Sequence, residues 1–513
     1  MQVGINKKGF TIVELLVVIV VIAILAAIAI VSYNGMISKA HEAGIQAETE
    51  QNAKAMQSYQ TIRGNYATNC ADAGVKVGTD NVLSCASSSD GQQFCVGVSR
   101  NGIAYYSTNG HLTPREGSCS GFVGIAAGSE FTDIAAGQGV TCGVAGGKAY
   151  CWGGNWSGQL GNGTTNDSTS PVAVTAAPGV LAGKTVTDIS VGDAHGCAVA
   201  DGAAYCWGEG GSGQLGNSGT ADSTTPVPVN TSGVLSGKTV TKVAANGDQT
   251  CLIADARAYC FGDTYEGALG NGVTVRTDQT TPVAVSTSGV LSGKTVTDIS
   301  VGGYYAYNAC VVADGGAYCW GVNDWGQLGN GDSGNSALPV AVNTSGVLAG
   351  KTVTSVSMYE YHACAVADGA AYCWGGNGNG YLGNGEANGT LRYLPVAVDT
   401  TGVLAGKTVT AVAPGDYHTC VIANGQVYCF GSTYGGVIGN GVFHVHSNVT
   451  SPVAVNTAGV LAGKTATVLA SGYAHACVIA SGMPHCWGES WGGALGQGSD
   501  TSSGVPVLVA PLP

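Results

Sequence analysis

The chain has 513 residues, of which 83 are glycine and only 10% are charged. Glycine makes up about 16% of the chain, more than twice the usual ~7%, but no Gly-X-Y triplet repeats and only 14 prolines are present, which excludes collagen. A hydrophobic content of 45% excludes a disordered chain. The net charge of −13 argues against nucleic acid as a partner, because phosphate binding needs clustered Lys and Arg.

The N-terminal segment predicts entry into a membrane. Residues 10–31 are apolar except for Thr11 and Glu14, and Lys7 and Lys8 precede them. A helix of this length spans a hydrocarbon layer of ~30 Å, and the lysines favour a cytoplasmic N-terminus. No clear signal-peptidase site follows the apolar run, so we expect the segment to be retained.

The stretch KKGFTIVELLVVIVVIAIL resembles the class III leader of type IV pilins and pseudopilins. The resemblance implies that residues 1–9 are a leader, that a prepilin peptidase cuts between Gly9 and Phe10, and that Phe10 is then N-methylated. It also implies that Glu14 pairs with the free N-terminal amine of a neighbouring subunit, and a carboxylate within an apolar helix normally has such a partner. The alternative is a plain membrane anchor with an incidental Glu14. Removal of two lysines would change the side-chain charge to −13 − 2 = −15.

A polar helical stretch follows the apolar run, and we expect one transmembrane and stalk helix over residues 10–65. Residues 66–120 are rich in turns and predict strands at 94–98 and 103–107 around Asn101-Gly102. Together, residues 10–120 resemble a small pilin, followed by a linker at 121–130. Four cysteines in this part permit three pairings, of which Cys70 with Cys85 and Cys95 with Cys119 is weakly favoured.

The remaining fourteen cysteines form seven pairs whose members are nine residues apart: Cys142 with Cys151, Cys197 with Cys206, Cys251 with Cys260, Cys310 with Cys319, Cys364 with Cys373, Cys420 with Cys429, and Cys477 with Cys486. A turn dipeptide such as Asp201-Gly202 lies between the members of most pairs and is typical of a type I′ hairpin. Counting outward from that turn places Cys197 opposite Cys206, with Cα atoms ~4.5 Å apart, close enough for a disulfide. A zinc site would need two to four residues between ligands. We therefore expect seven disulfides and an oxidising compartment.

The first cysteines of successive pairs are 54 to 59 residues apart, which indicates a repeat over residues 131–513. Each unit contains three or four short β-rich runs, including the two arms of the disulfide hairpin. Seven such units predict a β-propeller. A solenoid is the alternative, although it would need polar end caps, which the sequence does not show.

The unit resembles the RCC1 repeat, through the segments Gly192-Asp193-Ala194-His195, Tyr205-Cys206-Trp207-Gly208 and Gly213-Gln214-Leu215-Gly216. The cysteine pairs depart from the nuclear members of that family, and basic residues are scarce. We therefore do not transfer nucleotide exchange or chromatin binding. The resemblance implies instead a disc that can bind proteins outside the cell.

Two recurring features favour structural roles. The segment GVLAGKT, as at 179–185, has three residues between its glycines where a phosphate-binding loop needs four before its GK pair, so we expect a turn between repeats. His195, His362, His418 and His475 precede a cysteine by two residues and could form a metal-binding ring. Other units hold Val140, Gln249 and Asn308 there, so bonding to nearby backbone is favoured and no metal is expected.

Large aromatic rings precede the G-x-L-G turn in five units and are the candidate ligand face: Trp156, Tyr265, Trp325, Tyr434 and Trp491. Rigid amphipathic rings on loops suit sugar or peptide surfaces, whereas the alternative is packing against the adjacent blade. Asp and Glu are scattered among turn positions and no hydrolase motif occurs, so we expect no enzyme and no cofactor. Calcium binding by loops such as 331–333 stays open.

These features predict a mostly β protein: an N-terminal transmembrane and stalk helix, a small pilin-like sheet and a seven-bladed RCC1-like propeller. The expected function is that of a minor or tip pilin-like subunit, which moves from the cytoplasmic membrane to the cell surface or an extracellular pilus. Its expected partners are other pilin subunits, the prepilin peptidase, the membrane and an unknown extracellular protein or glycan. A pseudopilin of a secretion or DNA-uptake system is the alternative, and a cell-surface hydrolase is a weaker one.

Overall fold

The computed structural model describes residues 43–56, 82–87, 94–100, 103–108, 111–116, 130–175, 179–303, 306–386, 389–443 and 447–513. The chain divides into two compact units, Met1–Ala127 and Gly128–Pro513. The predicted leader, the cleavage position between Gly9 and Phe10, the membrane span and Glu14 lie outside the described residues. Within the described part, no helix is long and apolar enough to cross a membrane.

The first unit contains a helix at 43–56 and a four-stranded antiparallel sheet. The strands follow chain order: β1 (Val82–Ser87), β2 (Phe94–Arg100), β3 (Ile103–Thr108) and β4 (His111–Glu116). The predicted strands at 94–98 and 103–107 are therefore present as β2 and β3, in which Arg100 pairs with Ile103. Two further strands flank them.

One side of the helix is buried because its apolar and small residues recur at helical spacing. Ile45, Ala53 and Met56 are almost fully buried, and Ile45 packs with Val98 of β2. Cys95, also in β2, is disulfide-bonded. The pairing of the four cysteines in this unit stays a prediction, because Cys70 and Cys119 lie outside the described residues.

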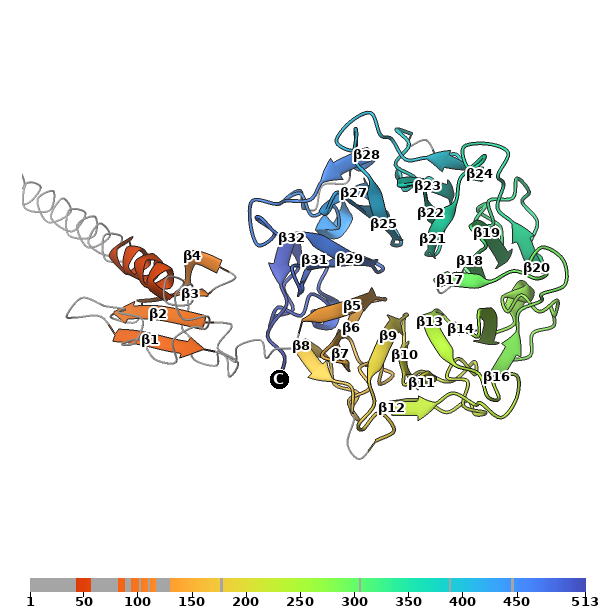
Figure 1. Ribbon diagram of the computed structural model, residues 1–513, viewed down its shortest axis with the longest axis horizontal. Coiled ribbons are helices and arrows are strands. Elements are labelled where there is room, and N and C mark those ends of the chain that lie inside the picture. The colour runs from red at the N-terminus through yellow and green to blue at the C-terminus, as the bar shows by residue number, and fades with distance from the viewer. Residues whose placement is uncertain are drawn as a thin grey trace, which may run out of the picture. The chain divides into compact units, whose positions relative to one another are not determined.

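The second unit is built from seven four-stranded antiparallel sheets, or blades, each formed by four consecutive strands (Figure 1). Blade 1 contains β5 (Phe131–Ala136), β6 (Val140–Ala145), β7 (Lys148–Gly153) and β8 (Ser168–Ala173). Blade 2 contains β9 (Val186–Val191), β10 (His195–Ala200), β11 (Ala203–Gly208) and β12 (Ser223–Pro228). Blade 3 contains β13 (Val240–Asn246), β14 (Gln249–Ala254), β15 (Arg257–Gly262) and β16 (Gln279–Ala284).

The other four blades repeat this plan. Blade 4 contains β17 (Val296–Val301), β18 (Asn308–Ala313), β19 (Gly316–Gly321) and β20 (Ser336–Ala341). Blade 5 contains β21 (Val353–Met358), β22 (His362–Ala367), β23 (Ala370–Gly375) and β24 (Arg392–Ala397). Blade 6 contains β25 (Val409–Pro414), β26 (His418–Ala423), β27 (Gln426–Ser432) and β28 (Asn448–Ala454), and blade 7 contains β29 (Ala466–Ser471), β30 (His475–Ala480), β31 (Met483–Gly488) and β32 (Ser503–Leu508). The first strand of each blade lies nearest the centre of the ring (Figure 1).

The second and third strands of each blade form the predicted disulfide hairpin. In blade 2, Cys197 pairs with Cys206 and Ala200 with Ala203, as counting from the turn predicts. Asp201 and Gly202 both have positive φ, 49° and 77°, as a type I′ turn requires. The local turn therefore sets the register that brings the two cysteines together.

All seven predicted hairpin disulfides are present, one in each blade. Their Cα–Cα distances are 4.0–4.1 Å, slightly shorter than the ~4.5 Å expected for a non-hydrogen-bonded pair. In each blade the two cysteines face each other across the second and third strands. From blade 1 to blade 7, the bonds join Cys142 to Cys151, Cys197 to Cys206, Cys251 to Cys260, Cys310 to Cys319, Cys364 to Cys373, Cys420 to Cys429, and Cys477 to Cys486.

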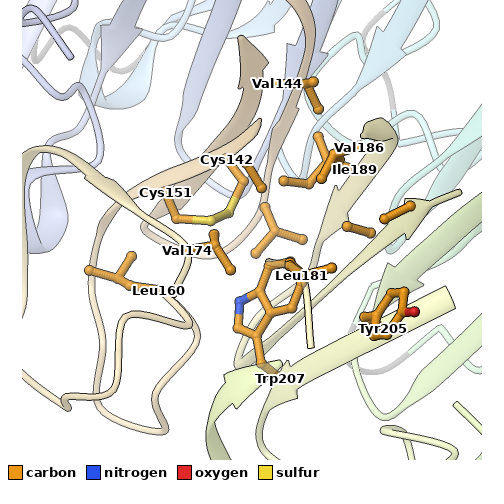
Figure 2. Packing of buried hydrophobic residues seen from close by; sticks show 14 of the residues in the cluster. Cys142, Val144, Cys151, Leu160, Val174, Leu181, Val186, Ile189, Tyr205 and Trp207 are labelled. Carbon is orange, nitrogen blue, oxygen red and sulfur yellow. A yellow bond between two sulfur atoms is a disulfide. The ribbon is translucent and has the colours of Figure 1, made fainter. Parts of the chain in front are cut away.

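The hydrophobic cores lie between neighbouring blades. Between blades 1 and 2, the Cys142–Cys151 disulfide and Leu160 of the first blade lie in the same cluster as Trp207 of the second (Figure 2). Leu181, from the GVLAGKT segment, belongs to the same cluster. A blade is thus stabilised mainly by its neighbours, which is why this repeat cannot fold as an isolated unit.

Hydrogen bonds also connect neighbouring blades. The buried indole of Trp207 donates through Nε1 to the carbonyl of Gln159 in the preceding blade, at 2.8 Å. The last glycine of the G-x-L-G corner faces this ring: a Cβ on Gly161, whose φ is 62°, would lie 2.9 Å from the indole of Trp207. The corner therefore needs glycine both for its backbone angle and for space. The equivalent indole bond, at 2.7–2.9 Å, is made by Trp152, Trp320, Trp374 and Trp487.

The ring closes, which excludes a solenoid. Phe131 and Trp152 of blade 1 share a hydrophobic cluster with Ile479 and Leu495 of blade 7. The amide of Phe131 donates to the carbonyl of Gly482 at 3.0 Å. Since the first and last blades each consist of consecutive strands, side-by-side packing closes the ring without exchange of a strand.

Candidate ligand-binding face

The antiparallel order places the blade connections on two opposite faces of the propeller. The connections between first and second strands, and between third and fourth strands, emerge on one face, which we call the pocket face. The disulfide hairpin turns and the GVLAGKT turns emerge on the other. A motif in either set therefore recurs around a single face.

The five predicted aromatic residues lie in connections between third and fourth strands, on the pocket face. Their exposed fractions range from 38% to 55%: Trp156, Tyr265, Trp325, Tyr434 and Trp491. Three of them begin single 3₁₀ turns, η1 (Tyr265–Gly267), η2 (Tyr434–Gly436) and η3 (Trp491–Gly493).

These rings also make aromatic contacts. Tyr265 lies 5.0 Å from Tyr307 of the next blade, and Trp325 lies 5.4 Å from Tyr361 of the next blade, as measured between ring centroids. Trp491 instead contacts Tyr473 of its own blade at 5.4 Å. Exposure and packing therefore coexist: one part of each of these rings is fixed by a neighbour while the remainder faces solvent.

A pocket of about 490 Å³ opens on this face. Its principal side chains are Trp156 from blade 1, Asp193 and Glu209 from blade 2, Tyr359 and Glu360 from blade 5, and Tyr473 from blade 7; Gln138, Ala194 and Gly247 complete the lining. Every one of these residues lies in a connection of the pocket face. Contributions from five of the seven blades place the pocket at the propeller axis.

The pocket is acidic. Burial, together with the nearby carboxylates of Glu360, Asp248 and Glu209, raises the pKa of Asp193 to about 7. Burial also raises the pKa of Asp248, to about 6. The pKa of Asp416 is raised by burial and by the neighbouring Glu360. Carboxylates from different blades thus converge here and oppose one another's ionisation.

Two polar atoms of the pocket lining are buried without a hydrogen-bond partner: Oδ2 of Asp193 and the hydroxyl of Tyr359. The exposed fractions of these residues are 8% and 3%. Buried polar groups normally have partners, and leaving one unpaired costs about 1–3 kcal/mol. These two atoms therefore provide unused hydrogen-bonding capacity in the pocket.

The expectation that acidic residues are scattered among turn positions is wrong for this face. Asp193, Glu360 and Asp416 each precede a histidine by two residues, so they occupy one position of the repeat. Tyr473 occupies the same position in blade 7. Aligning the equivalent segments of the seven blades shows that these residues share one position of the repeat, although it does not show which of them meet in a pocket.

The four histidines are completely buried, each at the start of the second strand of its blade. Burial lowers the pKa of His195 and His475 to about 4 and that of His362 and His418 to about 3, so all four are neutral near pH 7. His195 Nε2 lies 2.8 Å from the hydroxyl of Thr250 in the next blade. The favoured structural role is thus present, but the partner is a side chain of the next blade where nearby backbone was expected.

This histidine–threonine pair recurs. His362 bonds Thr419 at 2.7 Å and His475 bonds Thr141 at 2.8 Å. The hydroxyl of Thr250 also donates to the carbonyl of Gln214, so the imidazole must donate its Nε2 proton to Thr250. His418 is the exception: both of its ring nitrogens lack partners, and Ala476 stands where the other pairs have threonine.

Acidic residues of the innermost strands join the blades to one another. Asp133 accepts the amide of Ile189 at 3.1 Å, and Asp188 accepts that of Val243 at 2.7 Å. Asp298 accepts the amide of Val356 at 2.9 Å and is ion-paired with Lys242. These carboxylates therefore have structural partners. Within the described residues, no group of three or more His, Cys, Asp or Glu side chains is placed to hold a metal ion.

The GVLAGKT segment forms the predicted turn between blades. Gly183 has a φ of 74°, and the amide of Lys184 donates to the carbonyl of Leu181. The Lys184 ammonium lies 3.8 Å from Asp201 and 5.8 Å from the ring of Tyr205. This lysine is therefore directed onto the adjoining hairpin, on the face opposite the pocket.

Two family models match separate parts of the chain. The model of the regulator of chromosome condensation (RCC1) repeat matches residues 146–199, 201–253, 314–366 and 368–422. The model of the prokaryotic N-terminal methylation motif matches residues 5–30. The chain therefore carries a prepilin-type methylation motif and RCC1 repeats that form a seven-bladed β-propeller.

Among curated proteins, the human E3 ubiquitin-protein ligase HERC2 is 30% identical over 378 residues, covering 71% of this chain but only 7% of HERC2. The ultraviolet-B receptor UVR8 of Arabidopsis thaliana is 26% identical over 387 residues, covering 74% of this chain and 81% of UVR8. Among solved structures, human WBSCR16 has a TM-score of 0.59 and 19% identity, covering 71% of this chain and 93% of WBSCR16. Yeast RCC1 (Prp20) has a TM-score of 0.59 and 18% identity, covering 74% of this chain and 84% of Prp20. These likenesses show the fold.

The methylation motif and the seven disulfides indicate a pilin-like surface protein.

Proposed function

We propose that this protein is a minor or tip subunit of a type IV pilus-like filament and that its propeller recognises an extracellular ligand through the pocket face. The observation that carries the proposal is the combination, in one chain, of a prepilin methylation motif with a disulfide-bonded propeller whose aromatic rings face solvent on the pocket side. Within this proposal, the N-terminal helix assembles with other pilin subunits and the propeller is the part displayed.

The first unit supports a pilin-like assembly. Its helix packs through Ile45 against an antiparallel sheet, the arrangement expected of a small pilin head. The five exposed rings support recognition, because large aromatic side chains are rare on free surfaces and frequent in binding sites.

Size supports a minor or tip position. A propeller of roughly 380 residues has a radius of gyration of about 21 Å and is therefore about 50 Å wide, whereas packed helices lie about 10 Å apart. Propellers on every subunit would crowd unless the stalk helices were strongly staggered. Purified filaments in which this chain is the main component would contradict this placement.

Assembly can be tested in cells with the labelled full-length chain. Gly9→Val places a β-branched side chain at the predicted cleavage position. We expect wild-type protein to begin with N-methylated Phe10 and to form surface filaments or foci, and the variant to keep its leader and remain in the membrane. Mass spectrometry of the N-terminus and fluorescence imaging measure these outcomes. Foci that persist in an uncleaved variant would contradict the pilin-like assignment.

Recognition can be tested with the triple variant Trp156→Ala, Trp325→Ala, Trp491→Ala. We expect it to lose binding of cells or arrayed glycans and proteins while reaching the surface normally. The matched control replaces Val180, Val234 and Val347 by alanine, because these exposed apolar residues lie in the GVLAGKT-type turns of the opposite face. Equal binding by the two triple variants would argue against recognition through the pocket face. Turnover of a surface polymer would favour a hydrolase.

A further inference from the structure

We propose that the axial pocket binds an organic cation, an alkylammonium or guanidinium group, held between carboxylates and aromatic rings. The inference rests on the proposed recognition function and specifies the ligand chemistry of its central site. Its arguments come from the residues that line the pocket, so it does not require any particular filament.

The first argument is the excess of negative charge at the pocket. Asp193, Glu209 and Glu360 line the pocket, and Asp248 and Asp416 lie close enough to raise the pKa of a lining residue or to be raised by one. The charges acting on Asp193 are all those of other carboxylates. A cation entering the pocket would relieve this repulsion, whereas an anion would increase it.

The second argument is the pair of buried, unpartnered atoms. Asp193 Oδ2 can accept a hydrogen bond from an ammonium or guanidinium N–H, and the Tyr359 hydroxyl can accept another. Such charge-assisted bonds are among the strongest in proteins. A cationic ligand with several N–H groups would satisfy both atoms at once.

The third argument is the aromatic wall. Trp156, Tyr359 and Tyr473 line the same pocket, and Tyr473 is held by Trp491 and Tyr417 at ring-centroid distances of 5.4 Å. Cations bind over the faces of such rings, and the attraction grows when water is excluded. The combination of carboxylates with aromatic rings is therefore suited to an organic cation.

A bare metal ion fits the same pocket poorly. The volume of about 490 Å³ is in the range of small-molecule sites, far larger than one ion. In the described part of the chain, no group of acidic, His or Cys side chains has the geometry of a metal centre. Aromatic rings on the wall would also contribute no ligands to calcium or magnesium.

The test is calorimetric titration of the purified full-length chain in detergent micelles. The probes are spermidine, a free polyamine, and a short peptide containing one lysine, which represents a side chain of a protein partner. The matched neutral probe is the same peptide with norleucine in place of lysine. We expect binding of at least one cationic probe, weakened by salt, and no binding of the norleucine peptide.

Two variants locate the site. We expect Asp193→Asn and Glu360→Gln to weaken binding about tenfold or more, the effect of losing one charge-assisted contact. Asp332→Asn removes the same charge from an exposed loop position and should change affinity by less than about twofold. Circular dichroism of each variant verifies the fold, so that a loss of binding is not a loss of structure.

The outcomes of these titrations distinguish a protein side chain from a free polyamine as the ligand. They also separate the pocket inference from the wider recognition proposal. Binding of the lysine peptide alone supports a protein side chain as ligand, and binding of spermidine alone supports a free polyamine. No binding of either probe, equal binding of the norleucine peptide, or displacement of the bound probe by millimolar calcium would overturn the inference. Cation binding by a protein whose aromatic triple variant still adheres to cells would uphold the pocket and refute the wider recognition proposal.

Discussion

His475 and Thr141 are 334 residues apart in the chain, yet the imidazole Nε2 of His475 lies 2.8 Å from the hydroxyl of Thr141. His475 begins β30 in blade 7 and Thr141 belongs to β6 in blade 1, so this bond spans the closure of the ring. The hydroxyl also donates to the carbonyl of Ala494 at 2.9 Å. The first and last blades therefore share the contact that joins blades 2 and 3 and blades 5 and 6.

The first prediction compares two of these threonines. Thr250→Val should destabilise the propeller more than Thr141→Val, by about 1 kcal/mol. In blade 1, Trp152 still donates to the carbonyl of Ala494 when the hydroxyl is removed. In blade 3, Phe261 stands at the equivalent position and has no N–H to replace the bond from Thr250 to Gln214. Urea denaturation of both variants measures the difference, and equal destabilisation would contradict this account of the shared carbonyl.

The second prediction is a gain of stability. Ala476→Thr should stabilise the chain by about 0.5–1.5 kcal/mol by giving His418 the partner that the other three histidines have. The matched control is Ala476→Val, which adds a side chain of the same shape without a hydroxyl. We expect the control to lose stability through overpacking. A thermal midpoint that falls in both variants would show that the site lacks room for the hydroxyl.

The third prediction concerns pH. The pKa of Asp193 is about 7 in the folded protein against an ordinary value of 3.8, because of burial and of the carboxylates Glu360, Asp248 and Glu209. The folded state therefore holds a proton that the unfolded state releases, and stability is lost as pH rises from about 4 to 7. Asp193→Asn should stabilise the unliganded protein by about 2–4 kcal/mol at pH 8 and have little effect at pH 4. Denaturation curves at the two pH values measure this, and a gain that is equal at both would refute the electrostatic cause.

The four buried histidines change the stability of the folded state in the opposite direction over part of the same pH range. Their folded pKa values of about 3 to 4 lie below the ordinary 6.5, so the unfolded state binds protons first and stability falls as pH drops below about 6.5. For this reason the Asp193→Asn comparison must be made between variants at one pH, rather than across pH for one protein.

The fourth prediction concerns the seven hairpin disulfides. All fourteen of these cysteines are completely buried, so a thiol reductant should leave them intact in native buffer and reduce them once denaturant opens the blades. Alkylation followed by mass spectrometry counts the reduced cysteines. Each disulfide stabilises the fold by about 2 kcal/mol, so the reduced chain should unfold at markedly lower denaturant concentration. Rapid reduction in native buffer would mean that individual hairpins open independently of the ring.

The sequence was most informative where structure is local. The register of Cys197 against Cys206 follows from the dipeptide Asp201-Gly202, because a type I′ turn determines which residues face each other on the next few rungs. The repeat spacing then predicted the same hairpin in each of seven blades. Exposure of rings such as Trp156 was also predictable, since loops of one kind emerge on one face.

The axial pocket and the histidine partners could not be obtained in this way. Asp193 and Glu360 belong to blades 2 and 5, and only closure of the ring brings their carboxylates to one pocket. The same closure places Thr141 beside His475. The sequence by itself thus determined the repeating unit, its disulfide and its turn chemistry, all of which depend on contacts within a few residues. The tertiary structure alone decided which distant residues meet at the axis and across the closing interface, because those contacts depend on the number of blades and the angle between them.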